Sequence, residues 1–176
     1  GANVVTPQKT EFQEVMPYPV PPTSRDLTLE SPLTVGAGLG YTIMEERILF
    51  TVDGKWLNWG DADGYRDFDW EDQWVVGAGV QFAAIPKKLF LRLGYNYGSN
   101  PVKENNGWSP APTDGRFVQG TFFPNAAYEA FRIIGFPAIV EHHLTAGIGY
   151  AFSERFELNL AYMHAFQNRV SETSAG

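Results

Sequence analysis

Six stretches of this sequence alternate large apolar residues with small or polar ones, and this period of two limits the fold more than any other feature. From position 33 to 43 the odd residues are apolar, whereas the even residues are three glycines and two threonines. The pattern recurs at 47–59, 74–83, 89–98, 143–152 and 155–165. Because successive side chains of a strand point to opposite faces, each stretch has one apolar and one small, polar face. The sequence therefore predicts an all-β fold.

Aliphatic residues fill the middle of each apolar row and aromatic residues occupy its ends. Each stretch has about the length that a tilted strand needs to cross a bilayer, roughly 9–11 residues. This is the outward face of an outer-membrane β-barrel with two aromatic girdles. We therefore predict an antiparallel transmembrane β-barrel whose lipid-facing residues near mid-membrane include Leu39, Val52, Val80, Leu93, Ile148 and Leu160.

The connections between the stretches alternate in length, as they do in bacterial barrels with short periplasmic turns and long outer loops. Residues 44–47, 83–88 and 153–154 are short connections, whereas 60–73 and 99–141 are long ones. On this interpretation residues 1–30, with Pro17, Pro19, Pro21 and Pro22, form an extracellular loop segment, and residues 31–176 form the C-terminal part of the barrel.

Six strands are too few for a closed barrel, since the smallest bacterial barrels have about 8. We therefore expect a fragment, or a chain that shares a barrel with a missing half or another protein. Its unpaired sheet edges are expected near 33–43 and 155–165. The alternative is a soluble lipocalin-like barrel. That fold would place Thr, Lys, Glu and Gln on the second face, where this sequence repeatedly places glycine.

The composition excludes some classes of ligand and of activity. The formal net charge is −7 and the pI is near 4.9, which argues against nucleic acid as a ligand because nucleic acids bind to basic surfaces. The sequence has no cysteine. It also contains no arrangement of Ser, His and Asp, or of Cys and His, that indicates nucleophilic catalysis. We predict no enzyme activity, no cofactor and no metal.

Four segments together resemble the C-terminal half of the FadL family of outer-membrane transporters for long-chain fatty acids and other hydrophobic compounds. They are residues 68–74 leading to Gly77 and Gly79, residues 91–97 followed by 100–102, residues 136–145 leading to 147–150, and residues 158–164. The resemblance implies a fourteen-stranded barrel, within the size range of bacterial barrels, in which the six stretches are the eighth to thirteenth strands. It also implies an N-terminal plug, which the residues present do not include.

Arg92 is the sharpest candidate for a functional residue. The alternation places it on the inward face near mid-strand, with Asp53, Lys55, Arg155 and Glu157 on the same face of other strands. A charge inside a barrel needs partners or water. We favour a structural charge network in the lumen, with Asp53 or Glu157 as the carboxylate beside Arg92. The alternative is that Arg92 attracts the carboxylate head group of a passing ligand.

Apolar residues in the expected outer loops are a second set of candidates, since such residues are uncommon on long surface loops unless they pack together or bind something. We predict either a lid with its own small core or a landing site for a hydrophobic ligand, and the two are compatible. The candidate ligand-binding residues are Phe12, Met16, Phe122, Phe123 and Phe131, and Val15, Phe117 and Tyr128 share the pattern.

Two motifs suggest metal binding but have simpler explanations. His142 and His143 are adjacent on a strand, so their side chains point to opposite faces, and they are expected, like His164, to be interfacial polar residues. The acidic loop at 60–73 lacks the residue spacing of a calcium-binding loop, so we interpret it as a solvated loop.

The sequence therefore predicts an outer-membrane channel for passive uptake of hydrophobic small molecules such as long-chain fatty acids. The alternative is a structural or interaction barrel in the outer membrane, whose outer loops bind another cell-surface protein.

Overall fold

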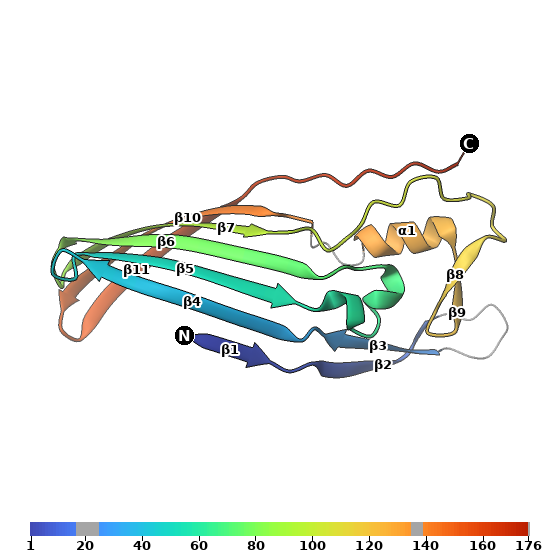
Figure 1. Cartoon of the computed structure of the whole chain (residues 1–176), viewed down its shortest axis with the longest axis horizontal. Helices are drawn as coiled ribbons and strands as arrows, with labels where there is room; N and C mark the ends of the chain where they lie inside the picture. Colours follow the sequence, from blue (N-terminus) through green and yellow to red (C-terminus); the bar gives the residue numbers. More distant parts are fainter. Residues whose placement is uncertain (17–24, 135–138, 176) are drawn as a thin grey trace.

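The computed structural model describes residues 1–16, 25–134 and 139–175. Its main feature is a seven-stranded antiparallel sheet with the order β1-β4-β5-β6-β7-β10-β11 (Figure 1). The strands are β1 (Ala2–Val5), β4 (Thr34–Ile43), β5 (Ile48–Leu57), β6 (Gln73–Ile85), β7 (Leu89–Gly98), β10 (His142–Ser153) and β11 (Phe156–Ala165). The six predicted strands are thus confirmed as one sheet, and β7 pairs with β10 although 43 residues separate them in the sequence.

The first thirty residues do not form the loop that we expected. The strand β1 pairs with the first half of β4, and β2 (Gln8–Met16) pairs with β3 (Arg25–Ser31). Together they make one long hairpin that extends beyond the sheet (Figure 1). The alternation in residues 8–16 and 25–31 is short and polar, so periodicity alone did not separate it from loop. Residues 17–24, with the proline run, lie outside the described residues.

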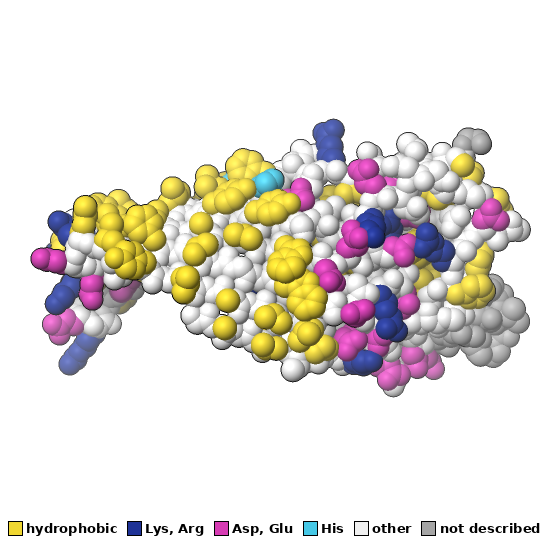
Figure 2. Space-filling view, in the orientation of Figure 1, with side chains coloured by type: hydrophobic (Ala, Val, Ile, Leu, Met, Phe, Trp, Pro, Cys, Tyr) yellow, Lys and Arg dark blue, Asp and Glu magenta, His cyan; other side chains and the backbone are white. Residues whose placement is uncertain are grey.

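The register places the apolar rows on one face of the sheet, which we call the apolar face. Leu39 pairs with Val52, Val80 with Leu93, and Ile148 with Leu160. Along β7 the residues of this face are exposed while the intervening residues are half-buried. Figure 2 shows hydrophobic side chains distributed over the sheet and charged side chains gathered at its two ends. The prediction that the apolar residues of the six strands share one face of the sheet is confirmed. Many of these residues are exposed.

One end of the sheet carries a folded layer that we call the cap. It consists of the β2–β3 hairpin and residues 58–72, 99–134 and 166–175. The two long connections, expected as loops, contain the short 3-10 helices η1 (Trp59–Asp61) and η2 (Arg66–Phe68), the hairpin of β8 (Gly115–Val118) and β9 (Thr121–Pro124), and the helix α1 (Asn125–Ile134). The opposite end of the sheet, which we call the turn end, has only tight connections.

The hydrophobic core of the described residues lies in the cap. Its buried members are Leu27, Phe68, Trp70, Val102, Val118 and Tyr128. The hairpin β8–β9 fits against β3 because Gln119 at its tip accepts a hydrogen bond from the Thr28 amide at 2.9 Å and donates one to the Thr28 carbonyl at 2.8 Å. Gln119 and Gly120 both have positive φ, as a two-residue hairpin turn of type I′ requires. The part of the prediction that gives these connections a small core of their own is confirmed.

The sheet is open, and β1 and β11 form its edges. The edge at β11 agrees with the prediction. The edge predicted at 33–43 is only partly unpaired, because β1 pairs with the part of β4 from Thr34 to Ala37.

Candidate functional site

The face of the sheet opposite the apolar face, which we call the glycine face, carries the candidate site. Thr51, Gly79, Gly94 and Thr145 form one row across four strands, and the next row toward the turn end contains Gln81, Arg92 and Gly147. These two rows line a hollow of about 380 Å³. A Cβ atom on Gly94 would lie 2.6 Å from the Thr145 hydroxyl oxygen, so glycine is needed there to keep the hollow open.

Arg92 lies half-buried at this hollow, and two amide side chains hold it in place. Its Nε donates to Oε1 of Gln81 at 2.7 Å, and Nη1 donates to Oδ1 of Asn159 at 2.7 Å. Gly149 leaves room for the second bond, since a Cβ there would lie 2.9 Å from Nη1 of Arg92. Figure 1 shows the strands β6, β7 and β11 from which these side chains come.

The prediction places a carboxylate, Asp53 or Glu157, within reach of Arg92. Within the described residues Arg92 forms no ion pair with either one. The carboxylate of Glu157 nevertheless lies close to it, since a Cβ on Gly149 would be 2.9 Å from Nη1 of Arg92 and 3.3 Å from Oε1 of Glu157. Neutral amide oxygens accept hydrogen bonds from two of the five donors of Arg92. The guanidinium is therefore oriented, charged and next to a hollow, which is an arrangement suited to a planar anion such as a carboxylate.

The expected lumen charge network does not form among the described residues. Asp53 lies between glycines: a Cβ on Gly77 would come within 2.8 Å of its Oδ2. Lys55 packs beside Gly36, one row nearer the cap. Arg155 lies at the β10–β11 turn, and the carboxylate of Glu157 lies over Gly149. The strand alternation correctly placed Asp53, Lys55 and Glu157 on one face, but Arg155 lies in the turn, and the register spreads the charges along the face rather than pairing them.

The apolar candidates in the cap divide into half-buried and exposed residues. Phe123 is half-buried and borders the core of the cap, with its ring centroid 6.2 Å from that of the fully buried Phe68. Phe131 is 37% exposed, although its ring centroid lies 5.1 Å from that of Phe68. Phe122 is half-buried, and its ring centroid lies 5.5 Å from that of Phe117, which is 71% exposed. Phe12 on β2 is exposed opposite Leu27. The side chain of Met16 lies outside the described residues.

The two adjacent histidines point to opposite faces, as predicted. His142 pairs with Tyr97 and lies on the apolar face, where its Nδ1 is 2.6 Å from the Tyr95 hydroxyl. His143 pairs with Asn96 on the glycine face. His164 lies on the apolar face, and its ring centroid is 4.8 Å from that of Phe166. Two imidazoles on opposite faces cannot bind one ion.

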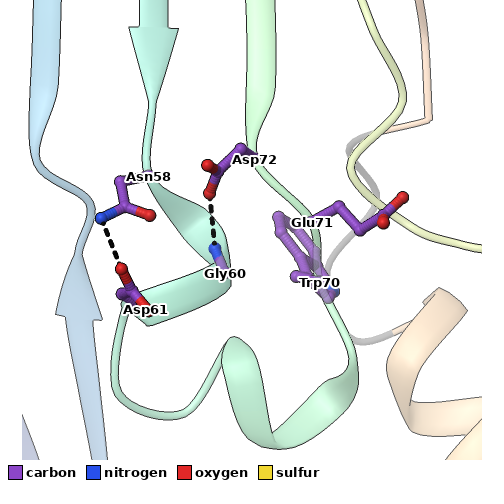
Figure 3. A pocket seen from close by; sticks show the side chains of 6 residues that line it. All are labelled: Asn58, Gly60, Asp61, Trp70, Glu71 and Asp72. Atoms are coloured by element: carbon purple, nitrogen blue, oxygen red, sulfur yellow. Dashed lines mark hydrogen bonds between the residues drawn. The ribbon is translucent and has the colours of Figure 1, made fainter.

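The acidic connection between β5 and β6 is a folded part of the cap and not the solvated loop that we expected. Around a hollow of about 480 Å³, Asp61 accepts a hydrogen bond from the Asn58 amide, and Oδ1 of Asp72 accepts one from the Gly60 backbone (Figure 3). The other oxygen of Asp72 accepts a bond from the Trp56 indole at 3.1 Å. The carboxylates thus orient the connection. Among the described residues, no group of three or more His, Cys, Asp or Glu side chains is arranged to hold a metal ion.

A buried polar cluster in the cap was not predicted. Arg132 on α1 is fully buried and forms ion pairs with Glu129 at 2.8 Å and with Glu172 from the C-terminal segment. Asn105 donates to both carboxylates. Burial raises the pKa of Glu172, and the charge of Arg132 opposes that shift. The spacing of Glu129 and Arg132 is a helical signal that could have revealed one pair, whereas the contribution of Glu172 depends on the tertiary fold.

Comparisons with family models, with curated proteins and with solved structures found no match for this chain. None of the helices in residues 1–16, 25–134 and 139–175 combines the length and the apolar character needed to cross a membrane.

Proposed function

We propose that this chain forms part of a transmembrane β-barrel of the bacterial outer membrane, and that the barrel is a channel for passive uptake of hydrophobic small molecules such as long-chain fatty acids. The observation that carries the proposal is the exposed apolar face. Leu39 is 76% exposed, and Val52, Leu93 and Leu160 are all exposed on the same side of the sheet. Water-soluble monomers rarely expose a continuous apolar surface of this extent, whereas a bilayer stabilises it.

The aromatic residues support the same environment, because they occupy both ends of the apolar face. Trp56 and Trp74 lie next to each other near the cap, with ring centroids 6.4 Å apart. Tyr150 and Phe152 lie near the turn end, with ring centroids 4.7 Å apart. Aromatic residues at these two levels are typical of the interfaces between hydrocarbon and head groups.

The directions of the edge strands define what must close the barrel. Both β1 and β11 run toward the cap, since β4 and β10, their antiparallel neighbours, run away from it. An odd number of antiparallel strands cannot close on itself with antiparallel pairing. The sheet therefore requires a complementary segment with an odd number of strands, whether from this protein or from another, which gives the even total usual in bacterial barrels.

Arg92 and its hollow support the part of the proposal that concerns the ligand. The glycine face is then the lumen, and its hollow offers small and apolar walls with one guanidinium that forms no ion pair with a described residue. An amphiphile with a carboxylate head group matches this combination, because a carboxylate accepts two parallel hydrogen bonds from an arginine.

Single-cysteine labelling tests the membrane assignment, because the chain has no cysteine of its own. Leu93→Cys and Thr145→Cys each receive an environment-sensitive dye in outer-membrane preparations of cells that make the protein. We expect a hydrocarbon-like emission from the dye at position 93 and a water-like emission at position 145. Water-like emission at both positions would contradict the proposal.

Uptake measurements test the channel. Cells that make the protein are compared with cells carrying Arg92→Gln, using a labelled long-chain fatty acid and a labelled neutral hydrocarbon of the same length. We expect Arg92→Gln to slow fatty-acid uptake by roughly tenfold, as the loss of a hydrogen bond to a charged group implies, and to leave hydrocarbon uptake unchanged. Lys55→Gln, which removes a cation from the same face away from the hollow, is the control. Equal slowing of both compounds would assign Arg92 a structural role.

An interaction barrel remains the second candidate function, because the cap exposes large apolar side chains. Phe117 is 71% exposed and Ile134 is 77% exposed. A protein partner that binds the cap would cover them. Crosslinking from Phe117→Cys on intact cells tests this function, and a specific protein adduct together with unchanged uptake in the absence of the protein would favour it over the channel.

A further inference from the structure

The cations of the two ends of the molecule differ in their partners. In the cap, five cationic side chains form ion pairs with carboxylates: Lys9, Arg66, Lys103, Arg116 and Arg132. At the turn end, Arg47, Lys87, Lys88 and Arg155 form no ion pair with any described residue, although Glu45, Glu46, Glu154 and Glu157 are close to them in the sequence. The cations of the turn end are thus available to a ligand.

Three of these cations surround one hollow. The β6–β7 turn contributes Lys87 and Lys88, and the β10–β11 turn contributes Arg155, to a hollow of about 720 Å³. The backbone of Lys88 is bonded to β10, since its carbonyl accepts a hydrogen bond from the Ala151 amide at 2.8 Å. Lys87 adopts a positive φ of 61° in the tight turn. The backbone therefore holds Lys87 and Lys88 next to the end of β10.

The hollow is also bordered by exposed aromatic residues of the apolar face. Phe152 and Phe156 are each 60% exposed, and their ring centroids are 5.5 Å apart. The ammonium group of Lys88 lies 5.7 Å from the centroid of the Tyr150 ring. Aromatic rings next to extended cationic side chains form the boundary between acyl chains and head groups, where lysine and arginine reach the phosphates.

We propose that this hollow binds the phosphate head group of an anionic phospholipid in the leaflet on the turn side, with its acyl chains along Phe152 and Phe156. The proposal rests on the proposed membrane location. Lys87, Lys88 and Arg155 contact the phosphate. The two carboxylates at the hollow do not neutralise them: Glu157 lies over Gly149 on the glycine face, and Glu154 is exposed in the turn. Five cations of the cap are already paired with carboxylates, so they are less available to a phosphate.

The test measures flotation of the purified full chain with vesicles. One set consists of phosphatidylcholine, and the other is an equimolar mixture of phosphatidylcholine and phosphatidylglycerol. The variant Lys87→Gln/Lys88→Gln is compared with Arg47→Gln/Arg169→Gln, which removes the same charge from residues that do not line the hollow. A parallel titration with inorganic phosphate distinguishes a lipid head group from a free phosphate ion.

We expect the wild-type chain to bind both kinds of vesicle and to prefer those with phosphatidylglycerol. The Lys87→Gln/Lys88→Gln variant should lose this preference by about fivefold for each removed cation, with neutral-vesicle binding unchanged, and the control variant should keep most of it. Equal losses in both variants, or displacement by inorganic phosphate at the concentration of the lipid, would overturn the proposal. Failure to bind neutral vesicles would instead contradict the membrane location, and the head-group site with it.

Discussion

The cap and the sheet bury opposite kinds of side chain. In the cap, Phe68 and Tyr128 are fully buried, and five cations are paired with carboxylates. In the sheet, large apolar residues such as Leu39 are exposed, while half-buried positions hold small and polar residues. One chain thus contains a region organised as if water surrounds it and a region organised as if water is absent from its outer surface.

Whether burial of a hydrophobic side chain stabilises a fold depends on the solvent around it. In water, burial of apolar surface stabilises a fold by about 25 cal/mol per Å², so the cap builds a core from residues of distant segments. In hydrocarbon, no such driving force collects apolar side chains, and the backbone hydrogen bonds between strands must provide the structure. The long ladders of the sheet, with little apolar core, agree with the second condition.

The largest effect is expected from the core of the cap. Phe68→Ala removes a fully buried ring that contacts Phe123, Tyr128 and Phe131, and should destabilise the cap by about 3–5 kcal/mol. Hydrogen exchange should show faster exchange in α1 and in β8–β9 and unchanged exchange in β5 and β6. Leu39→Ala is the control, since its side chain is exposed. Loosening of the whole sheet by Phe68→Ala would show that the two regions fold as one unit.

The second largest expected effect tests whether the apolar face of the sheet is in contact with lipid or with water. Leu93→Arg should destabilise the protein by about 2–4 kcal/mol in a bilayer, because the charge would lie at mid-membrane. Thr145→Arg, on the neighbouring strand but on the glycine face, should have a smaller effect. Denaturant titration of the protein in vesicles measures both. If the two substitutions had equal effects, the apolar face would not be facing lipid.

A smaller effect is expected at the junction between the two hairpins of the cap. Gln119→Asn keeps a residue that tolerates positive φ but shortens the side chain, so both hydrogen bonds to Thr28 are lost. The free energy of unfolding of the cap should fall by about 1–2 kcal/mol. Gln13→Asn in the exposed part of β2 is the matched control. No difference between the two variants would show that the bonds to Thr28 contribute nothing.

The smallest effect concerns pH and the C-terminal segment. Because burial raises the pKa of Glu172, the docked segment holds a proton more tightly than the released segment does. Docking on Arg132 and Glu129 should therefore be strongest below the ordinary carboxyl pKa and weaken as the pH rises through the raised pKa. Proteolysis of residues 166–175 as a function of pH measures this. Glu172→Gln should flatten the dependence, and an unchanged dependence would assign it to another group.

The strands were predictable from sequence because each strand carries its own signal. The apolar row from Leu89 to Tyr97 has period two and ends at turns, so neither its type nor its face depends on distant residues. The pairing of β7 with β10 also followed, because the order of the strands and their alternation left few other arrangements. The position of Arg92 on the glycine face followed from the same alternation.

The hairpin at the N-terminus and the interior of the cap were not predictable in this way. The residues of β2 and β3 alternate only weakly, and their pairing is stabilised by contacts such as that of Lys9 with Asp63 in a distant connection. The same holds for Phe123 and Phe131, whose contacts with Phe68 depend on the tertiary fold.

By itself, therefore, the sequence determined the strands, their faces and the chemical character of each face, since alternation is a local property of the chain. Only the tertiary structure decided the partners of the charges: Arg92 bonds to two amides and not to Asp53 or Glu157, and Arg132 binds a glutamate 40 residues away. The physical reason is that register and loop packing set distances between side chains to within a few ångströms, and ion pairs and hydrogen bonds depend on those distances.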